Sequence, residues 1–155
     1  MRRNDYALLI YCHEPRCNQS WLITMECSDW EVHFASSIDE LFLKLKQRPN
    51  YFDILVIDVM APVPQECNNI SFTLPEIIEM REGMNTGVVC AKKIWKDLDR
   101  DYPIIFVSAR NLDITSDQEL NIHICDFLRK PFLERNLDQM LCDIINKYDI
   151  EPCPG

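Results

Sequence analysis

The chain has 155 residues, of which 47% are hydrophobic, and its formal net charge is −9. This length and composition are typical of one compact domain with a single core. The acidic balance argues against direct nucleic-acid binding, because phosphate contacts need clustered Lys and Arg, and no apolar stretch is long enough to predict a transmembrane helix.

The eight cysteines form no C-x-x-C pair and no zinc-type spacing with histidine. Residues 1–5 lead into only a short apolar run, so we predict no signal peptide. We therefore expect a cytoplasmic protein with reduced thiols, because a core of this size does not need a disulfide framework.

Short apolar runs predict buried parallel strands, since strands covered on both faces lack polar alternation. The five candidates are residues 7–11, 30–34, 54–57, 104–107 and 126–129.

Amphipathic stretches between these runs predict helices. Residues 37–45 begin at Ser37, which can cap the helix, and Glu40 follows three residues later. The other helices are expected at 86–98 and 133–148, and a less regular one at 16–27. Alternating strands and helices predict an α/β fold with a doubly wound, five-stranded parallel sheet.

We expect a single domain over residues 1–150, and residues 151–155 as a tail or the start of a linker. Residues 63–83 interrupt the alternation as a long insertion after the third strand. This segment could form a lid over a pocket, an extra helix, a partner-binding element or a folded decoration.

Polar residues follow three of the predicted strands, at the edge where ligands bind in such sheets. Asp58 follows the third strand, Ser108 the fourth and Lys130 the fifth. A carboxylate, a hydroxyl and an ammonium in one pocket suit phosphoryl transfer to the carboxylate. A capping role for Asp58 alone is the structural alternative.

Three segments resemble the receiver domains of response regulators in two-component signalling: Asp-Val-Met-Ala-Pro at 58–62, Val-Ser-Ala-Arg at 107–110 and Leu-Arg-Lys-Pro-Phe at 128–132. Gly83-Met84-Asn85-Thr86-Gly87 resembles the opening of that family's third helix. The separation between Ser108 and Lys130 is also typical of the family. The resemblance covers about residues 6–148 and implies a flavodoxin-like, CheY-like fold.

By this resemblance Asp58 is the phospho-acceptor, Lys130 the phosphate-binding cation with a cis peptide to Pro131, Ser108 the switch hydroxyl and Phe127 the switch aromatic. It implies a signalling module, not an enzyme. Its expected partners are a histidine kinase or phosphotransfer protein and a second copy of the chain, with no nucleic acid and no membrane. Mg²⁺ is the expected cofactor, with Asp58 and the Met60 carbonyl among its ligands.

The family's acidic pair after the first strand is altered here. The sequence reads Tyr11-Cys12-His13-Glu14-Pro15, so the pair becomes Cys12-His13, or His13-Glu14 if the register shifts by one. In the second register Glu14 would be a metal ligand. Either way a carboxylate is missing, which predicts weak Mg²⁺ binding because Mg²⁺ prefers oxygen ligands. His13 could instead recruit a softer metal or be structural.

Two functions remain open. The first is a receiver that is phosphorylated on Asp58 and then switches partner binding, which Asp58, Ser108 and Lys130 favour. The second is a pseudo-receiver that binds partners without phosphorylation, which the altered pair favours. A small unrelated α/β enzyme is disfavoured, because the sequence offers no nucleophile–base pair and no Gly-rich nucleotide loop.

Overall fold

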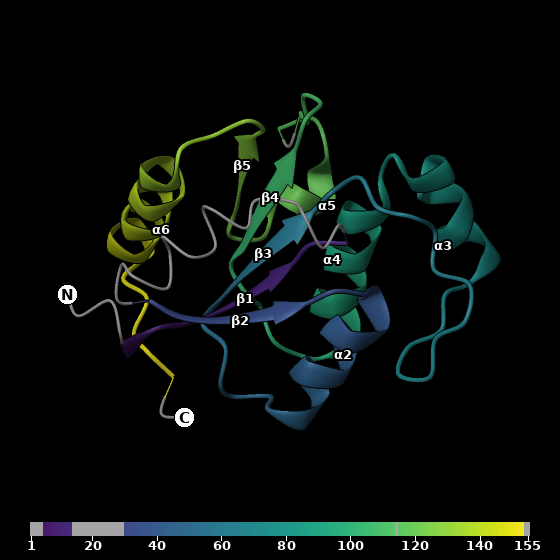
Figure 1. Ribbon diagram of the computed structural model, residues 1–155, viewed down its shortest axis with the longest axis horizontal. Helices are drawn as coiled ribbons and strands as arrows, with labels where there is room; N and C mark the ends of the chain where they lie inside the picture. Colours follow the sequence, from purple (N-terminus) through teal and green to yellow (C-terminus); the bar gives the residue numbers. More distant parts are fainter. Residues whose placement is uncertain (1–4, 14–29, 114, 154–155) are drawn as a thin grey trace.

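The computed structural model describes residues 5–13, 30–113 and 115–153. Glu14 and the helix predicted at 16–27 lie outside these residues. The strands are β1 (Ala7–Tyr11), β2 (Glu31–Ala35), β3 (Ile54–Asp58), β4 (Ile104–Ser108) and β5 (Cys125–Arg129). The helices are α2 (Ile38–Gln47), α3 (Leu74–Glu79), α4 (Thr86–Asp97), α5 (Gln118–Asn121) and α6 (Glu134–Tyr148), with the short 3₁₀ helix η2 (Arg81–Gly83) (Figure 1).

The five strands form one parallel sheet in the order β2-β1-β3-β4-β5. This confirms the predicted doubly wound, flavodoxin-like α/β fold. All residues of β1, β3 and β4 are buried, which explains why these strands are continuous apolar runs in the sequence.

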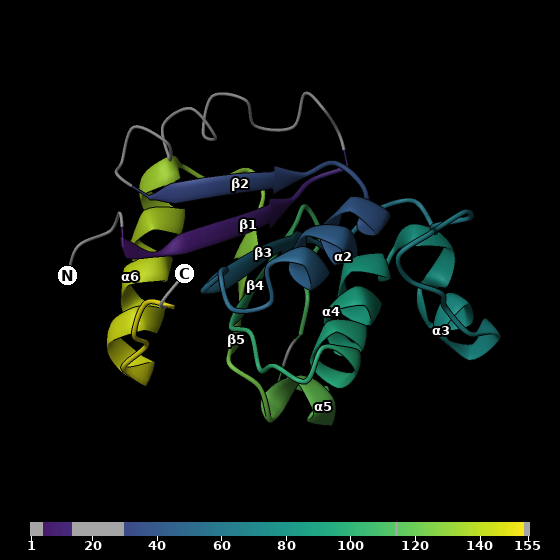
Figure 2. The ribbon, with the colours of Figure 1, turned by 90° about the horizontal axis from the view of Figure 1, so that it is seen from below.

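Helices cover both faces of the sheet (Figure 2). One core cluster joins α2 and α4 to the sheet through residues such as Leu41, Phe42 and Ile94. The other joins α6 through Leu137 and Leu141. Helices α2, α4 and α6 therefore bury the apolar stripes that their sequences predict.

The amino edge of the sheet is tied to the end of the chain. The Tyr6 hydroxyl donates to the Ile150 carbonyl at 2.8 Å. The Cys153 N–H donates to the Asp53 carboxylate at 2.7 Å, and the Ala7 N–H donates to its other oxygen at 2.7 Å. The segment after α6 is therefore part of the folded structure as far as Cys153.

The inserted segment (residues 63–83) leaves the fold and returns to it at nearly the same place. The Ala61 N–H donates to the Gly83 carbonyl at 3.1 Å, and the Thr86 hydroxyl donates to the Ala61 carbonyl at 2.7 Å. Because its two ends are fastened together, the sheet accommodates the insertion without any change in strand order.

Within the inserted segment, α3 is the extra helix that was one of the predicted alternatives. Thr73 caps it, accepting from the Glu76 N–H, and the Glu76 carboxylate accepts from the Thr73 N–H. Lys93 and Lys92 of α4 hold α3 in place through ion pairs of 2.9 Å to Glu76 and Glu79. The helix lies beyond the carboxyl edge of the sheet, beside α4 (Figures 1 and 2).

Candidate functional site

The carboxyl ends of β3, β4 and β5 bring the predicted site residues to one edge. Asp58 is the last residue of β3 and pairs with Val107, and Ser108 ends β4. The Lys130 N–H donates to the Ser108 carbonyl at 2.8 Å, which places Lys130 directly beyond β5. The peptide between Lys130 and Pro131 is cis, as the resemblance implied.

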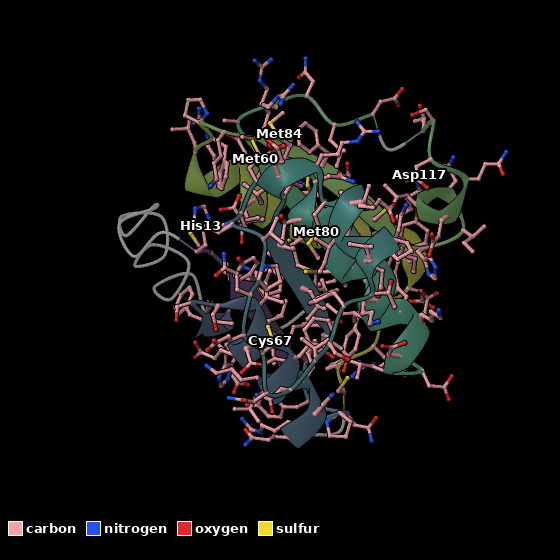
Figure 3. The ribbon with its side chains drawn as sticks, turned by 90° about the vertical axis from the view of Figure 1, so that its right-hand side faces the viewer. His13, Met60, Cys67, Met80, Met84 and Asp117 are labelled. Atoms are coloured by element: carbon pink, nitrogen blue, oxygen red, sulfur yellow. The ribbon has the colours of Figure 1, made fainter. Side chains whose placement is uncertain are left out.

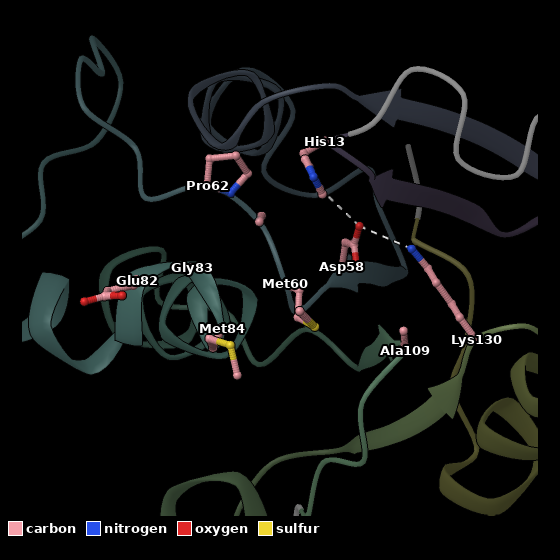
Figure 4. A pocket seen from close by; sticks show the side chains of 10 residues that line it. His13, Asp58, Met60, Pro62, Glu82, Gly83, Met84, Ala109 and Lys130 are labelled. Carbon is pink, nitrogen blue, oxygen red and sulfur yellow. Dashed lines mark hydrogen bonds and ion pairs between the residues drawn. The ribbon is translucent and has the colours of Figure 1, made fainter.

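A cavity of about 530 Å³ opens at this edge. Figure 4 shows His13 and Lys130 on either side of Asp58, with Pro62 and Met84, which flank the inserted segment, forming part of the wall. Both belong to motifs that the sequence singled out, whereas the return of Glu82 to the site was not predicted, because the length of the insertion obscured where its last residues lie. The full lining is His13, Asp58, Met60, Ala61, Pro62, Glu82, Gly83, Met84, Ala109 and Lys130.

Asp58 is 5% exposed, and its environment acts on its charge in two directions. Burial raises the pKa of the carboxyl above its ordinary value, while the neighbouring Lys130 and His13 lower it; burial is the larger effect. The Lys130 ammonium and the His13 Nδ1 each lie 3.4 Å from the same oxygen, Oδ2. Both distances exceed those of a tight charge-assisted hydrogen bond, so the carboxylate has nearby basic partners but can still accept stronger hydrogen bonds.

His13 occupies the position at which the sequence predicted an altered acidic pair, and it faces Asp58. Its neighbour Cys12 is disulfide-bonded. The prediction of reduced thiols is therefore wrong at Cys12, whose sulfur is not a thiolate available for a metal. The other described cysteines are free: Cys67, Cys90, Cys125, Cys142 and Cys153.

Ser108 lies beside the main cavity rather than in its lining. It is 2% exposed, and its hydroxyl accepts from the Arg110 N–H at 3.1 Å. It lines an adjoining cavity of about 160 Å³, which shares Met84 with the main one. Phe127, on β5, is half-buried against the core cluster of α2 and α4.

The described residues fit Mg²⁺ poorly. Asp58 and Glu82 are the carboxylates of the described cavity lining, and Glu82 points away from Asp58 (Figure 4). Met60 lines the cavity, and its side chain lies near that of Met84 (Figure 3); the role of its carbonyl as a metal ligand stays a prediction. Within the described ranges, no three His, Cys, Asp or Glu side chains are grouped to hold a metal ion. Mg²⁺ needs an oxygen-rich octahedral shell. Glu14, one of the predicted ligands, lies outside the described residues.

Gly87 fixes the backbone that carries Asp58. Its N–H donates to the Val59 carbonyl at 2.9 Å, so the start of α4 packs directly on the end of β3. A Cβ atom at this position would lie 2.2 Å from the Asp58 carbonyl oxygen. Only glycine permits this approach, which explains the Gly that ends the 83–87 motif.

No family model matches the sequence, and no curated protein matches it. Similar solved structures do exist. The chemotaxis protein CheY4 of Vibrio cholerae has a TM-score of 0.65 at 18% identity, covering 90% of this chain and 98% of that one. The receiver domain of Francisella response regulator 1452 has a TM-score of 0.66 at 18% identity, covering 92% and 98%.

A two-component response regulator from Clostridium difficile is similar as well, with a TM-score of 0.64 at 17% identity, covering 93% of this chain and 98% of that one. Together these similarities confirm the predicted resemblance at the level of the fold: the chain has the fold of response-regulator receiver domains. No helix among the described residues has the length and apolar character needed to cross a bilayer.

Proposed function

We propose that this chain is a phosphorylatable receiver, in which Asp58 accepts a phosphoryl group from a histidine kinase or phosphotransfer protein and thereby switches partner binding. The observation that carries the proposal is the arrangement at Asp58: a buried carboxylate at an open cavity, with Lys130 and His13 each 3.4 Å from one oxygen. A buried acid with a shifted pKa in a cavity is a functional-site signature.

The chemistry follows from these positions. A carboxylate oxygen of Asp58 attacks phosphorus in line, the new O–P bond forms, and the bond to the donor breaks with its electron pair leaving on the donor. Lys130 offsets the negative charge that accumulates. Because the described residues give Mg²⁺ few oxygen ligands, Mg²⁺ binding in this proposal is weak.

The switch would act through β4 and β5. A phosphoryl group adds about −2 charge, and Ser108 would have to move from the adjoining cavity to donate to it. Phe127 would then repack in the space left behind. The changed surface of β4, α5 and β5 would be read by a partner or a second copy, provided that it binds the two states with different affinity. A cytoplasmic location belongs to the same proposal.

The test is intact-mass spectrometry after incubation with acetyl phosphate, with and without Mg²⁺. We expect the mass of one phosphoryl group on the unaltered protein and none on Asp58→Asn. Asp99→Asn is the matched control, because Asp99 is exposed and does not line the cavity. Equal modification of Asp58→Asn would show that another residue is the acceptor.

A pseudo-receiver is the second candidate, and His13 in the place of an acid favours it. In that case the fold would serve as an interaction module whose partner ignores Asp58. Equal partner affinity for unmodified protein, acetyl-phosphate-treated protein and Asp58→Asn would support this candidate over the first.

A further inference from the structure

The charges around Asp58 are unusual for a metal-dependent site. Of the described side chains that line the cavity and approach Asp58, two carry basic groups, Lys130 and His13, and both approach Oδ2. A divalent cation at this oxygen would meet an ammonium and an imidazole in place of the oxygen ligands it requires. Among the described residues, the groups that approach Asp58 therefore favour an anion over a divalent cation.

We propose that His13 replaces the divalent cation, so that phosphoryl transfer to Asp58 proceeds without metal. This inference rests on the proposed function and names a second catalytic group for it. His13 lies in direct contact with the carboxylate that reacts. A histidine with only a structural role would not need to be at this position.

The imidazole lies against the reacting carboxylate. Its Nδ1 lies 3.4 Å from Asp58 Oδ2, and an Nδ1–H donor serves in the neutral tautomer as well as in the protonated ring. The His13 side chain is 26% exposed. It borders both the main cavity and a second one of about 440 Å³ that reaches the start of α2. A phosphoryl donor that enters the cavity can therefore contact the ring.

The transfer is complete in atoms and electrons without a metal. With acetyl phosphate, a carboxylate oxygen of Asp58 forms the new bond to phosphorus, and the bond between phosphorus and the acetyl oxygen breaks. Acetate leaves with the electron pair, and no net proton is taken up. Lys130 and His13 stabilise the phosphoryl oxygens by hydrogen bonds from opposite sides of Asp58.

The experiment compares phosphorylation rates of the full chain with acetyl phosphate in excess EDTA and in excess Mg²⁺. For the unaltered protein we expect equal rates. For His13→Asp, which restores an acid, the rate in EDTA should fall roughly a hundredfold, as when one transition-state donor is removed, and Mg²⁺ should restore it.

His33→Asp is the matched control. The two histidine side chains are similarly exposed, 26% for His13 and 29% for His33, but His33 lies in β2 and bonds to Glu31. This variant should be phosphorylated equally in EDTA and in Mg²⁺, like the unaltered protein. A response like that of His13→Asp would overturn the assignment, because it would reflect any new acid in the chain.

The remaining outcomes separate this inference from the proposed function. If the unaltered protein is modified in Mg²⁺ but not in EDTA, the phospho-receiver function stands and the role of His13 is wrong. If neither protein is modified under any condition, both proposals fall.

A calorimetric titration with Mg²⁺ gives an answer that does not depend on a variant folding correctly. The unaltered protein should bind Mg²⁺ only weakly, whereas tight binding would overturn the inference. Circular dichroism of each variant establishes that it is folded.

Discussion

Two buried aspartates bracket β3, and they differ in what surrounds them. Asp53, immediately before the strand, is 3% exposed, and its two oxygens accept backbone N–H groups of Ala7 and Cys153 at 2.7 Å. Asp58, the last residue of the strand, is 5% exposed, and the Lys130 ammonium and the His13 imidazole each lie 3.4 Å from its Oδ2. The two side chains are almost equally buried at opposite ends of one strand, so the difference between them lies in their partners.

The comparison shows how burial of a carboxylate can serve stability or chemistry. Short bonds from fixed backbone donors compensate the charge of Asp53 and join three distant parts of the chain. The partners of Asp58 are side chains at the greater distance of 3.4 Å, and burial is the larger effect, raising the pKa of its carboxyl. A buried carboxylate whose oxygens lack short hydrogen bonds is available to a ligand. A carboxylate whose oxygens both accept short hydrogen bonds from the backbone instead holds the fold together.

The largest effect is expected from Asp53→Asn. The Asn side chain keeps one oxygen that can accept a hydrogen bond but places an NH₂ group where the second oxygen was. One of the two backbone N–H groups, of Ala7 or Cys153, therefore loses its acceptor. We expect the free energy of unfolding to fall by about 3 kcal/mol, measured by urea denaturation.

The control for this variant is again Asp99→Asn, at an exposed position where Asn tolerates the positive φ of 48°. Its stability should match that of the unaltered protein. If Asp53→Asn proved as stable as this control, Asp53 would not be a clamp and the contrast between the two aspartates would fail.

Gly87→Ala tests whether the end of β3 that carries Asp58 is held by backbone packing against α4, and not by hydrogen bonds to the carboxylate as at Asp53. The new Cβ would meet the Asp58 carbonyl oxygen at 2.2 Å and Val59 Cα at 2.7 Å, both in the backbone. The strand and α4 must separate, which should cost about 2 kcal/mol despite the better helix propensity of Ala. Urea denaturation gives the stability, and acetyl phosphate labelling should show slower modification of the displaced Asp58. A fully stable, fully reactive variant would contradict the close approach.

Asp58→Asn is expected to have the smallest effect on stability and the opposite sign to Asp53→Asn. Because the folded protein raises the pKa of Asp58, ionising this group opposes folding, and the amide should stabilise by about 1 kcal/mol at neutral pH. The unaltered protein should recover this difference as the pH falls through the raised pKa of folded Asp58, and the recovery should be complete below the ordinary aspartate pKa of about 3.9, where the carboxyl is neutral in both the folded and the unfolded state. Thermal unfolding across that pH range measures it; a less stable Asp58→Asn at neutral pH would show that the cations outweigh burial.

The fold was largely predictable because its signals are local. The strand at 7–11 and the cap at Ser37 are observed as predicted, since a buried parallel strand must be apolar throughout and a helix start needs an acceptor for its free N–H groups. The topology then followed from the alternation of strands and helices. The placement of α3 on α4 was not predictable, because Lys92 and Lys93 read equally well as solvated surface charges.

The site divides in the same way. The sequence by itself predicted that Asp58 ends one strand and that Lys130 follows another, and the carboxyl ends of parallel strands lie at one edge of the sheet. Only the tertiary structure decided that His13 faces Asp58, that Ser108 lines the adjoining cavity, and that Asp53 clamps Ala7 and Cys153. These relations depend on side-chain directions and on contacts between residues far apart in the chain. No local pattern records them, because their energies arise only when the whole sheet has assembled.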